Sequence, residues 1–172
     1  MLLLNAAGSF DASVLEAADD HGVSWEDIVA GSATALDALG VKGAPREALL
    51  GLVSSGWCDG EVDQCEKKGI EIIFFGEARY PPVLNDLRDP PLVLYARGKG
   101  LPSGDAVAVV GTRKCTSYGS GCAYDLASML AGAGVAVVSG GARGIDGAAH
   151  RGSIDSGGRT VAVIGTGADI FY

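Results

Sequence analysis

The chain has few cysteines and no long apolar run. Its 172 residues include four cysteines, Cys58, Cys65, Cys115 and Cys122, which form neither a CxxC pair nor a Cys/His cluster. This spacing argues against a zinc site and against a disulfide framework. No apolar run approaches the roughly 20 residues of a membrane helix, and the first residues lack the basic region of a signal peptide. We therefore expect a cytoplasmic protein with no membrane partner, no metal and no cofactor.

The chain also lacks an excess of basic residues. Its net charge of −8 opposes nucleic-acid binding by the molecule as a whole. Residues 1–69 carry 12 acidic and 4 basic side chains, however, whereas residues 70–172 carry 9 of each. Only the second half could approach a polyanion. Its relevant basic residues are Arg113, Lys114, Arg143 and Arg151, and for Arg151 an ordinary solvated surface charge is the better interpretation.

Three similar apolar runs define the second half of the chain. Residues 107–112, 135–140 and 161–166 each contain a Val-Ala-Val start and reach a glycine, and their starts lie 26 to 28 residues apart. This spacing fits a strand, a crossover helix and a return, as parallel pairing requires. Apolar runs without alternation are typical of a sheet whose two faces are covered by helices. The pattern predicts neighbouring parallel strands at Val107–Val110, Val135–Val138 and Val161–Ile164.

Parallel strands place the glycine loops that follow them on one edge of the sheet. Helix N-termini at that edge offer unpaired N–H groups and a partial positive charge, which favour an anion, most simply phosphate. Glycine permits close backbone approach, and arginine can donate two parallel bonds to phosphate. The predicted binding residues are Gly111, Thr112, Arg113, Lys114, Ser139, Gly140, Gly141, Ala142, Arg143 and Gly144. Further candidates are Tyr118, Asp146, His150, Gly165 and Gly167.

Several of these candidates have a second interpretation. Asp146 and His150 stand four residues apart and could pair on one helix face, which is the favoured interpretation, or His150 could reach a nucleotide. Tyr118 could stack on a base or lie in the core. The first strand is not followed by GxGxxG and the second does not end in an acidic residue, so a nicotinamide enzyme is disfavoured. No constellation of a hydrolytic nucleophile with its base stands out.

The sequence divides into three predicted segments. Residues 1–68 read as a helical domain, residues 69–104 as a connector with strands, and residues 105–172 as the start of the parallel-sheet domain. Residues 39–48 resemble a helix-hairpin-helix turn, but their glycine spacing departs from the usual pattern, so a plain helical packing module is favoured. The predicted helices are Ala12–Asp20, Trp25–Val29, Pro45–Val53 and Asp59–Lys67, with later helices beginning near Ser117 and Ile145. Further strands are predicted at Ile70–Phe75 and Leu92–Tyr95.

Four motifs in order resemble the DNA-processing protein A family, also called DprA or Smf. They are YPPVLNDLRDPPLVLYARG at 80–98, VAVVGTRKCTSYG at 107–119, VVSGGARGIDGAAH at 137–150 and VAVIGTGADIFY at 161–172. The resemblance implies an α/β, Rossmann-like domain that binds single-stranded DNA without catalysis and helps to load RecA during natural transformation. It also implies that Gly111 to Arg113 form the phosphate-gripping turn, and that Ser139 to Gly141 with Arg143 form the second wall.

Members of this family continue beyond a third strand, into segments tied to dimerisation and RecA contact. We therefore expect these 172 residues to be the N-terminal part of such a protein, with an incomplete sheet, and a homodimer when complete. The alternative is an enzyme, a LOG-type nucleoside-monophosphate phosphoribohydrolase, whose first-strand turn and second glycine loop are similar. A generic nucleotide-binding module is a third possibility that rests on the fold alone.

Overall fold

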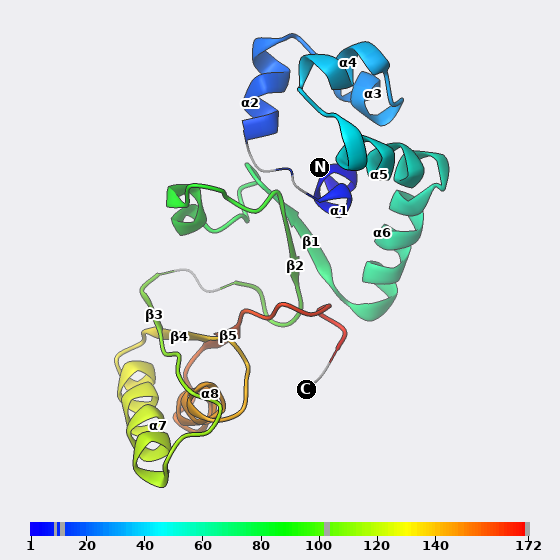
Figure 1. Ribbon diagram of the computed structural model, residues 1–172. Helices are drawn as coiled ribbons and strands as arrows, with labels where there is room; N and C mark the ends of the chain where they lie inside the picture. The colour runs from blue at the N-terminus through cyan, green and yellow to red at the C-terminus, as the bar shows by residue number, and fades with distance from the viewer. Residues whose placement is uncertain (9, 11–12, 102–103, 171–172) are drawn as a thin grey trace. The chain divides into compact units, whose positions relative to one another are not determined.

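The chain divides after Gly98 in the computed structural model, which describes residues 1–8, 10, 13–101 and 104–170 (Figure 1). Met1–Gly98 and Lys99–Tyr172 form separate compact units. Because the acidic excess lies in the first unit, the second carries six basic and five acidic side chains. The second unit is therefore close to neutral.

The first unit is mostly helical. Its helices are α1 (Leu2–Ala7), α2 (Ser13–Asp20), α3 (Trp25–Val29), α4 (Ala33–Ala38), α5 (Gly43–Ser54) and α6 (Trp57–Lys68), and a 3₁₀ helix η1 covers Pro82–Asp86. The sequence predicted α2, α3, α5 and α6 to within a few residues, although the predicted start at Ala12 lies outside the described residues. It missed α1 and α4, which have six residues each.

An antiparallel strand pair completes the first unit. Strand β1 (Glu71–Phe74) pairs with β2 (Val93–Ala96), with Ile72 opposite Tyr95. Leu92 and Val93 are buried in one cluster with helical residues such as Leu36 and Leu49. The three-segment division stays a prediction, but residues 70–98 share a core with the helices because the strand pair supplies part of it.

The second unit contains the predicted parallel sheet. Its elements are β3 (Ala106–Ala108), α7 (Ser117–Gly132), β4 (Ala136–Ser139), α8 (Ile145–Asp155) and β5 (Thr160–Ala162). The strand order is β3-β4-β5, and both pairs are parallel. The α/β, Rossmann-like fold class and the prediction of three neighbouring parallel strands are thereby confirmed.

Helices α7 and α8 cover the same face of this sheet. Both crossovers step in the same direction along the sheet, so right-handed connections bring both helices to one side. Val109 and Val137 are buried against alanines of the two helices. Val110 and Val163, at the alternate positions of their segments, are 69% and 65% exposed. The expectation that helices cover both faces is therefore wrong for the described residues of this unit.

Helix α7 begins with a side-chain cap. The hydroxyl of Thr116 accepts a hydrogen bond from the Gly119 N–H at 3.1 Å, and the helix starts at Ser117 as predicted. Ala123 and Ala127 are buried, whereas Leu126 is 43% exposed. Such small buried side chains let α7 and α8 approach closely, and the Ser128 hydroxyl donates to the Gly152 carbonyl of α8 at 3.1 Å.

Candidate functional site

Three loops follow the three parallel strands. Loop 1 is residues 111–114, loop 2 is residues 139–144 and loop 3 is residues 165–167. Because the strands are parallel, all three loops leave the carboxyl edge of the sheet. Helix α8 begins directly after loop 2.

Loops 1 and 2 are joined by backbone contacts. The Ile145 N–H donates to the Thr112 carbonyl at 3.2 Å. Gly144 has φ +90°, and a Cβ at this position would collide with the same carbonyl oxygen. Only glycine tolerates both this conformation and this approach. The two predicted walls of the site therefore lie against each other.

Most amides of these two loops are available to a ligand. In the part of the chain that the structure describes, no protein acceptor is recorded for six of their N–H groups. These belong to Thr112, Arg113, Gly140, Gly141, Arg143 and Gly144. Unpaired amides beside a helix N-terminus form a site for an anion.

The cations of the two loops are exposed. Arg113, Lys114 and Arg143 are all accessible to solvent, and no ion pair is recorded for them among the described residues. A guanidinium without a protein partner keeps all its donors for a ligand. The structure thus brings cations and open amides together at one edge.

Two hydroxyl groups of the loops differ in their role. Ser139 is 2% exposed, and its hydroxyl donates to the Val109 carbonyl at 2.6 Å, which joins β4 to the end of the first strand segment. The prediction that Ser139 contacts the ligand is therefore revised, because its side chain is buried and occupied. Thr112 is exposed and accepts from the Lys114 N–H at 3.2 Å, so its own O–H remains able to donate to an anion.

Tyr118 lies on the surface. It is 82% exposed in the first turn of α7, four residues after Lys114, which rules out the core interpretation. A hydrogen bond with the Cys122 side chain raises the pKa of Tyr118. An exposed aromatic ring is able to stack on a base.

His150 and Asp146 take different partners, so the predicted pair between them does not form. The Nδ1 of His150 lies 2.7 Å from the Thr160 hydroxyl, which itself donates to the Val137 carbonyl at 2.8 Å. Nδ1–H must therefore be the donor to Thr160. Since Thr160 begins β5, His150 faces the end of that strand opposite loop 3. Contact between His150 and a ligand at the loops is not supported.

This arrangement makes the second unit sensitive to acid. The Nε2 atom of His150 is buried and has no hydrogen-bond partner in the described residues. Burial lowers the pKa of His150 below its ordinary value of 6.5, against a smaller opposing effect of the Asp146 carboxylate. Protonation would place a charged N–H where no acceptor is recorded.

We expect the free energy of unfolding of this unit to decrease as the pH falls through 6.5 towards the lowered pKa of His150. The unfolded chain takes up the proton first in this window, and the slope for one proton cannot exceed about 1.4 kcal/mol per pH unit. Above the window His150 is neutral in both states and contributes no pH dependence. Urea titrations from pH 5 to 8, followed by hydrogen exchange in β4 and β5, measure the effect. His150→Gln should remove it and His21→Gln should retain it; identical profiles for wild type and His150→Gln would contradict the assignment.

Loop 3 adjoins loop 2 but contributes less to the site. A Cβ on Gly141 would lie 3.2 Å from the Ile164 side chain, so the two loops are neighbours. Gly165 and Gly167 are exposed, in keeping with their status as further candidates. Thr166, which no sequence pattern indicated, has a buried hydroxyl with no hydrogen-bond partner among the described residues. A single threonine in a glycine loop gives no sequence signal that distinguishes it from a packing residue.

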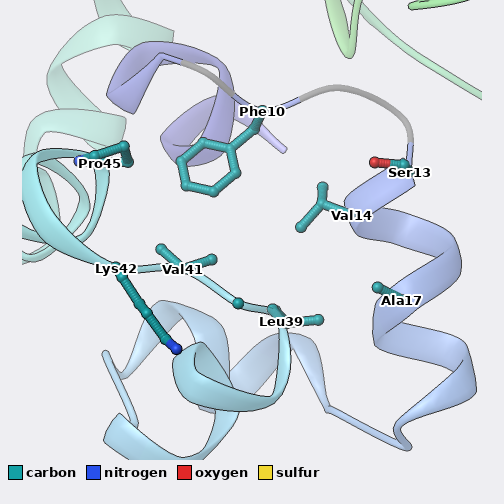
Figure 2. Close-up of a pocket in the computed structure, with 9 residues that line it drawn as sticks. Phe10, Ser13, Val14, Ala17, Leu39, Val41, Lys42 and Pro45 are labelled. Carbon is teal, nitrogen blue, oxygen red and sulfur yellow. The ribbon is translucent and has the colours of Figure 1, made fainter.

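The helix-hairpin-helix-like turn joins α4 to α5. It borders a cavity of about 240 Å³ in the first unit, where Phe10 and Val14 point towards Val41 (Figure 2). Val41 is 4% exposed, and its N–H already donates to the Leu36 carbonyl. These apolar walls agree with a helical packing module better than with a phosphate site.

The Tyr-Pro-Pro segment has a structural role. Tyr80 is 4% exposed, and its hydroxyl donates to the Pro91 carbonyl at 2.9 Å. Its ring also meets Phe75 edge to face, with ring centroids 5.4 Å apart. This part of the sequence pattern therefore stabilises the strand pair of the first unit.

Comparison with known proteins identifies the family. A sequence model of the family described as DNA recombination-mediator protein A matches residues 71–172, which include all three loops. The chain belongs to this family. The DprA/Smf resemblance of the four motifs is thereby confirmed.

Individual relatives agree with the family. A Mycobacterium tuberculosis protein that carries the DprA name is 58% identical over 85 residues, covering 48% of this chain and 22% of that protein. DNA processing protein DprA of Bacillus subtilis is 39% identical over 108 residues, covering 62% of this chain and 36% of that protein. The chain thus matches between about a fifth and a third of these relatives.

A solved structure extends the match to the fold. The X-ray structure of DNA processing protein A from Streptococcus pneumoniae superposes with a TM-score of 0.73 at 26% sequence identity, covering 99% of this chain and 58% of that chain. Among the helices of the described residues, none is long and apolar enough to cross a membrane. The same residues contain no group of three or more His, Cys, Asp or Glu side chains that could hold a metal ion.

Proposed function

We propose that this chain binds single-stranded DNA through loops 1 and 2, as part of a recombination mediator. The observation that carries the proposal is the convergence of six unpaired loop amides with Arg113, Lys114 and Arg143 at one edge of the sheet. These groups match the oxygens of a phosphodiester. The family, described as a DNA recombination-mediator, supports DNA as the polyanion.

A single strand fits the site better than a duplex. Proteins bind single strands with a cationic groove for the phosphates and aromatic rings for the bases. Tyr118 supplies an exposed ring close along the chain to loop 1. Its stacking would be indifferent to sequence, because every base has a π-face.

The proposal also covers what the protein does with the DNA that it binds. The protein would act in the cytoplasm without catalysing a reaction, would protect incoming single strands and would help a RecA-type recombinase to load on them. A homodimer of the complete protein is part of this proposal. The competing function is the hydrolysis of a nucleoside monophosphate to its free base.

Removal of either loop arginine should weaken DNA binding. We expect Arg113→Ala and Arg143→Ala each to lower the affinity for a fluorescent oligonucleotide about tenfold, because each removes a charge-assisted hydrogen bond to phosphate. The slope of log K against log salt should become shallower by about 0.7 for each phosphate that the variant no longer neutralises. Fluorescence anisotropy at several salt concentrations measures both quantities.

Arg151→Ala is the matched control, since it removes the same charge from an exposed position on α8. Its effect should be small, and the melting temperatures of all variants should stay close to that of the wild type. Unchanged DNA affinity in a folded Arg113→Ala/Arg143→Ala double variant would refute the proposed site. Release of adenine from AMP by the wild type would favour the enzyme instead.

A further inference from the structure

The Asp146 side chain forms a hydrogen bond with each of the two binding loops. Asp146 is the second residue of α8, and only 6% of it is exposed. Its Oδ1 accepts from the Gly111 N–H of loop 1 at 3.2 Å, and its Oδ2 accepts from the Ala142 N–H of loop 2 at 3.4 Å. One side chain therefore ties an amide of each loop to the first turn of a helix.

The backbone around Asp146 is shaped to receive this carboxylate. A Cβ on Gly140 would lie 2.8 Å from Oδ2, so any other residue there would press on the oxygen. A carboxylate in the first turn also interacts favourably with the helix dipole and the amides at that end. The carboxylate therefore uses the space that the glycine at position 140 leaves open.

The charge of Asp146 has the wrong sign for the site in which it lies. A negative group beside an anion-binding edge repels the ligand, and the Asp146 carboxylate, in a residue that is 6% exposed, only accepts hydrogen bonds and so has no donor for a phosphate. A compensating benefit must come from geometry. Loops held in place before binding lose less conformational freedom when the ligand arrives.

We propose that Asp146 is a positioning residue, which holds loops 1 and 2 in the arrangement that binds a DNA phosphate. The carboxylate occupies the amides of Gly111 and Ala142 and leaves those of Thr112, Arg113, Gly140 and Gly141 open. This inference rests on the proposed function. It adds that binding depends on a buried acid that never touches DNA.

The direction in which one substitution changes the affinity for DNA tests the proposal. Asp146→Asn removes a negative charge near the bound phosphate, so a purely electrostatic role predicts tighter binding. A positioning role predicts the opposite, since the amide group retains one acceptor and loses the other. We expect the affinity of the whole chain for a single-stranded oligonucleotide to fall about tenfold.

Two further variants separate geometry from charge. Gly140→Ala retains the carboxylate but presses on Oδ2, so it should weaken binding in the same direction. Asp125→Asn, at an exposed position on α7, is the control for charge alone and should leave binding unchanged or slightly tighter. Hydrogen exchange should show faster exchange at Gly111 and Ala142 in Asp146→Asn, with or without DNA.

The outcomes distinguish this inference from the proposed function. Wild type that binds DNA, together with Asp146→Asn that binds as tightly or more tightly, overturns the positioning role alone. Wild type that does not bind DNA overturns the proposed function and, with it, the role of Asp146 in binding. If Asp146→Asn fails to fold, Gly140→Ala decides, because normal affinity in that variant overturns the positioning role.

Discussion

Gly144→Ala should unfold the second unit more readily than any other single substitution in the loops. Its backbone, at φ +90° and ψ −129°, lies in a region that is essentially restricted to glycine, at a cost of about 1–3 kcal/mol for other residues. The added methyl group also collides with the Thr112 carbonyl, which is backbone and cannot rotate away. We expect a loss of about 3 kcal/mol or more in the free energy of unfolding.

Hydrogen exchange of the β4 amides is the measurement for Gly144→Ala. Both tryptophans, Trp25 and Trp57, lie in the first unit, so their fluorescence reports mainly on that unit. Gly121→Ala is the control, because Gly121 lies inside α7 with open space around its Cβ position. This control should stabilise the unit by roughly 1 kcal/mol. Equal exchange rates in Gly144→Ala and wild type would show that the loops do not meet as described.

Leu49→Ala should produce a loss of similar size in the first unit. Leu49 is 0% exposed on α5 and belongs to the apolar cluster that includes Leu36 and Leu92. Truncation of such a buried leucine removes its transfer free energy and leaves a cavity, which costs about 2–5 kcal/mol. Urea denaturation followed by tryptophan fluorescence measures the change.

The neighbouring Leu50→Ala is its matched control. Leu50 is on the same helix but is 37% exposed, so its truncation should cost well under half as much. Equal midpoints for the two variants would contradict the assignment of Leu49 to the core. A lower urea midpoint for Leu49→Ala alone is the expected result.

The sheet of the second unit was predictable because its signals are strong and local. Apolar runs such as Val107–Val110 ended in glycine at regular spacing, and the handedness of crossovers left one arrangement of neighbours. The side of the sheet that each helix covers depends on whether successive crossovers between strands run in the same direction across the sheet. That direction is a tertiary property, so the exposure of Val110 and Val163 could not be read from the runs themselves.

The location of the binding edge could be predicted from the sequence, but the role of each polar residue at that edge could not. Arg113 and Arg143 are exposed, as expected of residues that meet an anion. Ser139 begins loop 2 and Asp146 follows that loop in the first turn of α8, and the structure gives their side chains protein partners instead. A hydroxyl or carboxylate in a glycine loop has the same sequence signature whether it faces a ligand or a neighbouring amide.

The strand order of the sheet has a consequence for how the second unit forms during synthesis. Each strand pairs with the one before it in the chain, and the bonded residues Val109 and Ser139 are 30 apart, and Val137 and Thr160 are 23 apart. A newly made strand therefore finds its partner already outside the ribosome. Because closure of such short loops costs little entropy, the sheet can grow one βα step at a time from β3.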